Sequence, residues 1–447
     1  MKHSLFIVAL LLGAAPAQAG DLVDAWHAAL AHDPDYRGAE AARDAGREAA
    51  VQARALTWPS VQFQGSYQYN YVESNAALPE DLSPFFTGTR TSGRAAVGVQ
   101  AVQPIYDASK RAQSEQLREK AAGAEVQFGA DQQQLILRVA QSYFDVLAGE
   151  DKLGSYGRQV DAAEQQRRAA QARFDAGRAR ITDVREAEAR RDASEVQRIA
   201  AEADLANARA AFTALTGLPA EGLKRPDARF AAPLPTRSIE DAARQAEEHS
   251  PQVKAAEHAA RGAQAEISRY GLGGRPVVEG FAGYQGQYRL GGESGSGILP
   301  DRIQSASAGV RLTVPLYAGG AIRSKEREAQ ANATKAERAL DAARRDARLS
   351  AQKAWHAVST GSRRVSALGT AGKSAGAQQD AATIGRDVGI RTQSDVLDSQ
   401  SQSFATARDE AQAIYDYLLA RLQLAAATGE LDGEQLRQVN VLIGGKG

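Results

Sequence analysis

Two short stretches of this sequence hold the residues whose types and spacing could do chemistry. Residues 389–398 are GIRTQSDVLD, and residues 177–184 are GRARITDV. In both, a glycine is followed five residues later by Ser or Thr and then by Asp-Val. Glycine adopts the left-handed conformation of a helix C-cap without steric cost, and Ser/Thr-Asp suits the next N-cap because its oxygens accept orphan amide hydrogens. Each stretch therefore predicts the tight turn of an antiparallel helical hairpin.

Catalytic chemistry finds little support elsewhere in the chain. His27 and His32 lie five residues apart, which is not the helical spacing of a metal site, and there is no cysteine to join them. The glycine cluster at 271–274 lacks the Lys-Ser/Thr of a phosphate-binding loop. No nucleophile with its base is recognisable. We therefore expect no enzyme activity, no cofactor and no metal.

The two stretches belong to an internal repeat, because they lie about 212 residues apart and other positions recur at nearly the same shift. Matching pairs are Leu22 and Ile239, Pro34 and Pro251, Pro59 and Pro276, Tyr67 and Tyr284, Pro104 and Pro315, and Thr216 and Thr428. The repeat predicts a first half over 20–217, a connector over 218–238, a second half over 239–429 and a tail over 430–447.

Composition and targeting narrow the class of protein. Residues 1–19 have the charge, short apolar run and Ala-Gln-Ala end of a secretory signal peptide. No later segment is apolar enough for a spanning helix, and the absence of cysteine excludes a disulfide framework and a lipid-modified N-terminal cysteine. Lys and Arg total 54, as do Asp and Glu, so the balanced charge argues against a nucleic-acid partner.

Four segments alternate with a period of two residues, which predicts strands. In residues 61–71 and 278–288, apolar and aromatic positions alternate with mostly polar ones, and 95–101 and 306–314 are weaker copies. Ten tilted residues match a membrane-spanning strand, with the apolar side facing lipid. The expected lipid-facing residues are Val61, Phe63, Tyr67, Tyr69, Tyr71, Tyr284 and Tyr288. Two hairpins of a soluble sheet are the alternative.

Long helices follow each strand pair. We expect short helices over 21–31 and 35–56. The chain should then enter two long helices through Pro104 and Pro315, because proline is tolerated at a helix start. The first runs about 70 residues, roughly 105 Å, to its turn, and the second runs about as far, over 316–388. Helices of about 35 residues then return. Helices of this length exclude an ordinary globular domain.

The signal peptide, the two repeats, the strand hairpins and the Gly-x4-Thr/Ser-Asp-Val turns together resemble the TolC family of Gram-negative outer-membrane exit ducts. The resemblance covers nearly all of the mature chain. It implies an α+β membrane protein that forms a homotrimer, in which three chains of four strands close a twelve-stranded β-barrel in outer-membrane lipid. Helical hairpins would continue that barrel as a tunnel in the periplasm. A periplasmic adaptor and an inner-membrane transporter, ABC-type or proton-driven, would complete the export system.

The same resemblance assigns roles at the turns. Asp183, Thr182 and Arg391 match positions whose polar links close the periplasmic entrance, and Arg386 stands where the family usually has a tyrosine. Asp395 and Asp398 match rings of acid facing the pore. The simpler interpretation of Asp395 is a first-turn residue that favours the helix dipole. Residues expected to dock the adaptor are Gly177, Arg178, Gly389 and Ile390.

Competing functions remain at this stage. A passive exit duct could serve protein export or drug efflux, and the missing lipid-anchor cysteine favours export or a general-purpose duct. A trimeric coiled-coil fibre or adhesin would also explain the long helices. It would not require four alternating strands or a two-fold repeat.

Overall fold

The computed structural model describes residues 20–74, 88–226, 230–270, 276–290 and 302–445. The expected signal peptide, the glycine cluster at 271–274 and the expected loop at 291–297 lie outside the described residues. The chain forms two compact units. One contains residues up to Arg43 together with Val126–Ala255 and Asp341–Gly447, and the other contains Asp44–Glu125 and Ala256–Leu340.

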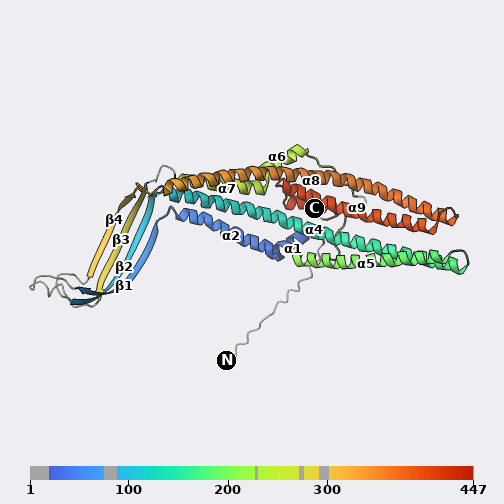
Figure 1. Cartoon of the computed structure of the whole chain (residues 1–447), viewed down its shortest axis with the longest axis horizontal. Coiled ribbons are helices and arrows are strands. Elements are labelled where there is room, and N and C mark those ends of the chain that lie inside the picture. The colour runs from blue at the N-terminus through green and yellow to red at the C-terminus, as the bar shows by residue number, and fades with distance from the viewer. Residues whose placement is uncertain (1–19, 75–87, 227–229, 271–275, 291–301, 446–447) are drawn as a thin grey trace, which may run out of the picture. The chain divides into compact units, whose positions relative to one another are not determined.

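The helices confirm the repeat, because each half presents the same order of elements (Figure 1). In the first half these are α1 (Leu22–His32), α2 (Pro34–Ala55), α4 (Ala108–Asp175) and α5 (Ile181–Thr216). Their counterparts are α6 (Ile239–His249), α7 (Pro251–Tyr270), α8 (Ala321–Asp387) and α9 (Gln393–Ala427). The predicted lengths of the long helices are confirmed, since α4 has 68 residues, α8 has 67, and the returning helices have 36 and 35.

Local sequence explains where the short helices begin. The Asp21 carboxylate accepts hydrogen bonds from the amides of Val23 and Asp24, and the Ser238 hydroxyl accepts one from the Asp241 amide. These side chains satisfy donors that have no partner within the helix. Pro34 and Pro251 open the following helices, where a missing amide hydrogen costs nothing.

A core of large side chains lies midway along the hairpins of the first unit. Tyr143, Phe212 and Leu147 are fully buried, and Phe144 stacks on Tyr415. The segment predicted as a tail adds a helix to this core, α10 (Gly433–Leu442), whose Leu436 and Asn440 are fully buried. The Asn440 side-chain oxygen accepts a 3.0 Å hydrogen bond from the Leu22 amide. The tail is therefore a structural element that ties the end of the chain to its first helix.

The connector between the halves is also bound to this core. The hydroxyl of Tyr143 donates to the carbonyl of Lys224 at 2.9 Å, and that of Tyr417 donates to the carbonyl of Pro233 at 2.6 Å. Arg225 bridges the acidic pair Glu150 and Asp151 on α4. These contacts hold a connector whose described residues, 218–226 and 230–238, form neither strand nor helix.

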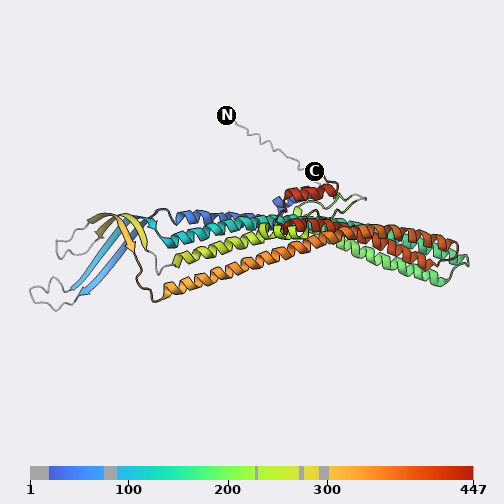
Figure 2. The same cartoon turned by 90° about the horizontal axis from the view of Figure 1, so that it is seen from above.

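The second unit contains one antiparallel sheet in the order β1-β2-β3-β4 (Figure 2). The strands are β1 (Ser60–Ser74), β2 (Gly88–Tyr106), β3 (Val277–Leu290) and β4 (Arg302–Thr313). All are longer than the expected ten residues. The register aligns Phe63 with Val99, Val99 with Tyr284, and Tyr284 with Ala306. Since directly opposed residues share a face, the apolar positions of all four strands lie on one side.

The expectation that prolines start the long helices is wrong. Pro104 lies within β2, which continues through a register shift to Tyr106, and α4 begins at Ala108 after the Asp107 side chain accepts from the Lys110 amide. Pro315 precedes α8 by several residues, and Gly319 and Gly320, both with positive φ, make the turn. A bulge lets a strand accommodate proline, so proline alone did not mark the helix boundary.

Candidate functional site: the hairpin tips and the two faces of the sheet

The two expected turns are present at the ends of the α4–α5 and α8–α9 hairpins (Figure 1). Gly177 has φ 71° and Gly389 has φ 86°. The amide of Arg178 donates to the Arg173 carbonyl at 2.8 Å, and that of Ile390 donates to the Gly385 carbonyl at 2.9 Å. These hydrogen bonds close each outgoing helix in the same way, which confirms the prediction of two equivalent C-caps.

The N-caps lie two residues earlier than the Ser/Thr-Asp pattern indicated. In the second turn the cap is Thr392, whose hydroxyl accepts from the Asp395 amide at 3.1 Å, while the Asp395 carboxylate accepts from the Thr392 amide at 2.8 Å. In the first turn the cap position is Arg180, and only the Asp183 carboxylate serves, accepting from the Arg180 amide at 3.3 Å. Both aspartates occupy the third residue of their helix and accept from the cap amide, and the second turn completes a reciprocal capping box, which a Thr-x-x-Asp spacing signals.

This geometry determines the charge of Asp395. The hydrogen bonds from Thr392, and then the positive charge of Arg391, lower the pKa of the Asp395 carboxyl below its ordinary value. Asp395 therefore stays ionised under acidic conditions that would begin to neutralise an ordinary aspartate. The capping interpretation and a pore-facing charge are compatible, because the cap hydrogen bonds favour the ionised form of this carboxylate.

Asp398 has a different environment. Its carboxylate accepts from the Arg190 guanidinium on α5 at 2.6 Å. One turn closer to the tip, the Ser394 hydroxyl donates to Glu186 at 2.9 Å. The structure thus brings Asp398 into an ion pair between the two returning helices, so its charge is largely balanced within one chain.

A second polar cluster joins the two hairpins. The side-chain oxygen of Gln166 accepts from Arg386 at 3.2 Å and from the Gln393 amide group at 2.6 Å. Arg173 donates to the oxygen of Gln393 at 3.2 Å. Arg386 on α8 is therefore a donor to α4. Sequence reasoning missed Gln166, Arg173, Gln393 and Arg190, since only the fold brings together positions more than 200 residues apart.

The other expected gate residues are not joined within one chain. Asp183 contacts the backbone of its own turn, and the Arg391 side chain has no hydrogen-bond or ion-pair partner among the described residues. Thr182 is exposed. Ile390 is 80% exposed at the apex of the second turn. The roles of these residues in gating and docking stay predictions.

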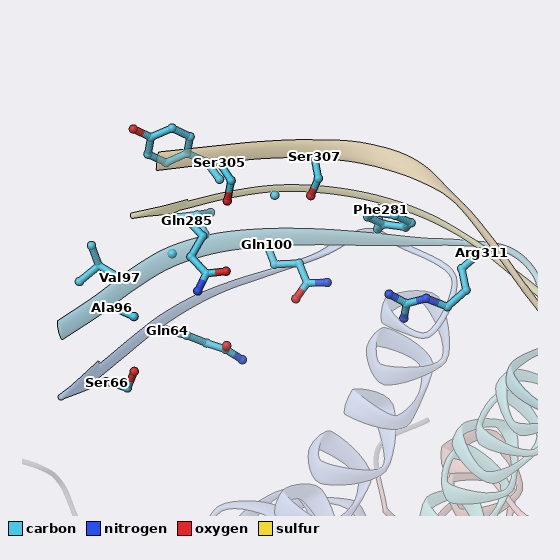
Figure 3. A pocket seen from close by; sticks show the side chains of 14 residues that line it. Gln64, Ser66, Ala96, Val97, Gln100, Phe281, Gln285, Ser305, Ser307 and Arg311 are labelled. Carbon is cyan, nitrogen blue, oxygen red and sulfur yellow. The ribbon is translucent and has the colours of Figure 1, made fainter. Parts of the chain in front are cut away.

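The sheet has two faces of opposite chemistry. Phe63 is 73% exposed and Tyr67 66% exposed on the apolar face. The other face carries Gln64, Gln100, Gln285, Ser305 and Ser307, which line a shallow hollow with Arg311 beside Phe281 (Figure 3). An exposed apolar face opposite a glutamine- and serine-rich face is the pattern of a strand set between lipid and water.

Other kinds of site find no geometry to support them. Among the described residues, no helix is both long and apolar enough to cross a membrane. Over the same ranges, no group of three or more His, Asp or Glu side chains could hold a metal ion.

A strand hairpin and a long helical hairpin, each present twice in one chain, define the class of outer-membrane channel proteins. The family model described as outer membrane efflux protein matches residues 25–218 and 242–430, and the chain belongs to this family. The matched ranges include the strands and both repeats, and they lend no support to a fibre.

Individual relatives agree with this assignment over nearly their full length. Outer membrane protein TolC of Vibrio cholerae serotype O1 is 30% identical over 432 residues, covering 94% of this chain and 93% of the relative. Proteases secretion protein PrtF of Dickeya chrysanthemi is 27% identical over 448 residues, covering 98% and 94%. The chain is therefore an outer-membrane exit duct of the secretion and efflux type, in a Gram-negative bacterium.

Solved structures show the same fold. A membrane protein from Pseudomonas aeruginosa superposes with a TM-score of 0.77 at 19% identity, covering 92% of this chain and 91% of that one. CusC superposes with a TM-score of 0.76 at 18% identity, covering 92% of both chains.

Proposed function

We propose that three copies of this chain assemble into one passive duct that exports cargo without catalysis. The observation that carries the proposal is the isolated four-stranded sheet with an exposed apolar face and a polar face. A membrane does not tolerate open sheet edges, because no water is present to satisfy their backbone groups. The edges here are β1 and β4. Closure with neighbouring copies satisfies both edges.

Strand directions support the closure. Each neighbouring pair in the sheet is antiparallel, so β4 runs opposite to β1. The β4 edge of one copy can therefore pair with the β1 edge of the next in the same antiparallel sense. Three copies would give twelve strands. The apolar face would meet lipid, and the glutamine-rich face would line the lumen.

At the tips we propose a gate and a docking surface. Asp183, Thr182, Arg391 and Arg386 would hold the entrance, and Asp395 would supply a ring of three negative charges. Asp398 would contribute less charge than expected because of its pair with Arg190. Gly177, Arg178, Gly389 and Ile390 would meet the periplasmic adaptor, and the exposed Ile390 offers an apolar contact for it.

For the cargo we propose protein export with an ABC-type inner-membrane transporter. Two relatives similar over most of the chain carry names of protease secretion, PrtF of Dickeya chrysanthemi and AprF of Pseudomonas aeruginosa. Drug efflux with a proton-driven pump is the second candidate. Outer membrane efflux protein BepC of Brucella suis, 28% identical over 360 residues, favours it.

The facing of the sheet gives the sharpest test. Tyr67 is exposed on the apolar face, and its neighbour Gln68 projects from the other. A lysine on the lipid face costs about 2–4 kcal/mol at mid-membrane. Tyr67→Lys should therefore reduce the amount of detergent-extracted trimer in the outer-membrane fraction, while Gln68→Lys should leave it near the parent level. Equal yields for both variants, or a soluble periplasmic monomer from the parent, would contradict the proposal.

A further inference from the structure

Charges on the polar face of the sheet are confined to its two ends. The middle rows carry uncharged glutamine, serine and glycine, such as Gln64 opposite Gly98 and Gln285 opposite Ser305. At the end next to the helices, Arg311 lies opposite Glu279, and Lys110 approaches Glu279 at 3.8 Å. At this end, the carboxylate of Glu279 therefore lies beside the positive charges and balances part of them.

The opposite end is different, because two arginines face each other there. Arg94 of β2 is the direct register partner of Arg289 of β3. By the two-residue period, Arg94 shares a face with Gln100, and Arg289 shares a face with Gln285 (Figure 3). Directly opposed residues place their Cβ atoms about 4.5–5.5 Å apart, and like charges in this position destabilise a sheet.

Nothing in the described part of the chain offsets this repulsion. Neither guanidinium has a carboxylate partner within the described ranges, and Gln68, the β1 residue opposite Arg94, is uncharged. By contrast, Arg302 lies on the apolar face, where it stacks over the Tyr288 ring with its Cζ atom 5.4 Å from the ring centroid. Arg302 is therefore a suitable control residue, because it carries the same charge at the same end of the sheet but on the apolar face.

We propose that Arg94 and Arg289 form a cationic station on the lumen face, which takes the carboxylate or phosphate groups of anionic cargo. This inference rests on the proposed trimeric duct, in which three copies place six guanidinium groups around one opening. Guanidinium groups bind carboxylates and phosphates through paired hydrogen bonds. When charges of one sign line a lumen with low-dielectric walls, their electric field is focused there and raises the local concentration of counter-ions.

The station opposes the charge of the hairpin tips. Asp395 would present negative charge at one end of the duct, and the arginine pair would present positive charge within the barrel. Anions inside the barrel relieve the repulsion between Arg94 and Arg289, so binding there is favourable to the sheet as well as to the anion. The expected outcome is weak retention of anions at the barrel and weak exclusion at the tips.

The test uses the full-length protein purified in detergent and inserted into planar bilayers. Reversal potentials in a potassium chloride gradient should show that Arg94→Gln with Arg289→Gln raises the potassium-to-chloride permeability ratio by about twofold or more. Citrate, added to each side in turn, should block the parent channel and should block this variant less. The glutamine variant should fold, because it removes a contact between like charges. A second variant, Arg94→Lys with Arg289→Lys, keeps both charges, so it should retain the ion selectivity but bind citrate more weakly.

Arg302→Gln is the matched control, since it removes a cation from the lipid-facing side and should leave both readings at parent values. An unchanged permeability ratio and citrate block in the Arg94/Arg289 glutamine variant would overturn the station while leaving the duct intact. An equal effect of Arg302→Gln would also overturn it, because the response would then follow net charge and not the lumen face. A parent protein that conducts no ions would instead reject the duct itself.

Discussion

The middle and the tip of the helical hairpins are built from the same helices but are held by different forces. In the middle, Tyr143, Phe144 and Phe212 are almost fully buried, and the Tyr143 ring contacts both phenylalanine rings edge to face. At the tips the buried apolar residues are aliphatic, with Ala170, Val184 and Ala187 clustered on the first hairpin and Val396 and Leu397 on the second. Large apolar side chains contribute about 1.5–3 kcal/mol each on burial, and alanine contributes far less. The middle is therefore the more stable part, and the tips have less apolar packing to resist motion.

Polar contacts differ in the same way. In the middle, burial raises the pKa of the Tyr143 and Tyr415 hydroxyls, so both stay protonated donors. Tyr415 donates to Asp151 at 2.6 Å in this shielded environment. At the tip, Arg190 and Asp398 form their ion pair while largely exposed, where such a pair contributes about 0–1 kcal/mol. Weak, exposed contacts suit a gate that must open, and shielded ones suit a fixed support.

The largest predicted effect is on stability, and it is tested by replacing a phenylalanine in the middle and another at the tip. Phe212→Ala should destabilise the helical unit by about 3–5 kcal/mol, because it leaves a cavity in the packed middle. Phe174→Ala, at the tip, should cost well under half as much because Phe174 is already 38% exposed. Guanidinium-induced loss of helical circular dichroism in detergent measures both. Similar midpoints for the two variants would show that stability is spread evenly along the hairpins.

Some parts of the structure were predictable from the sequence and others were not, because only some structural signals are local. Period-two alternation predicted the strands and their facing, and glycine at the turns predicted the hairpins, because each signal is local. The α10 helix was missed, because its sequence pattern is short and the helix is stabilised by the burial of Leu436 and Asn440 against α1 and the core. The junction at Pro104 was misjudged because a β-bulge and a helix start both accept proline.

The tip contacts were the least predictable part. Asp395 and Asp183 were recognised, but their hydrogen bonds within the turns depend on the caps, Thr392 and Arg180, which lie three residues before them. Arg190 could not be assigned to Asp398 from the sequence. Repeats are aligned by their common shift, whereas this ion pair joins positions of the two repeats that do not correspond.

A smaller effect should separate the two tips from each other. Thr392→Ala removes the hydroxyl that accepts from the Asp395 amide, and loss of such a cap costs about 0.5–2 kcal/mol. Arg180→Ala removes no capping side chain from the first turn, so it should have almost no effect. Amide hydrogen exchange in the first turns of α9 and α5 measures this locally. Faster exchange in the Thr392 variant alone is expected, and equal changes at both tips would indicate that the turns are stabilised by something other than their caps.

The prediction with the smallest expected free-energy change concerns the proposed gate at the hairpin tips. Arg391 has no side-chain hydrogen bond or ion pair in the described part of its own chain, although its charge acts on Asp395, and Asp183 contacts only its own turn. Each is therefore available to a residue on a neighbouring copy. One exposed pair contributes about 0–1 kcal/mol, and three-fold repetition would bias the entrance toward closure without locking it. Asp183→Asn is preferred to alanine, because an asparagine oxygen can still accept from the Arg180 amide and keep the cap.

Arg391→Ser with Asp183→Asn should therefore raise single-channel conductance in planar bilayers while trimer yield stays unchanged. Arg178→Ser, which removes a neighbouring tip cation outside the expected link, is the control and should conduct like the parent. If the double variant also conducts like the parent, Asp183 acts only as a cap and the closed entrance depends on other contacts. The cluster around Gln166, Arg386 and Gln393 would then be the next candidate, since it joins the two hairpins within each chain and does not require a neighbouring copy.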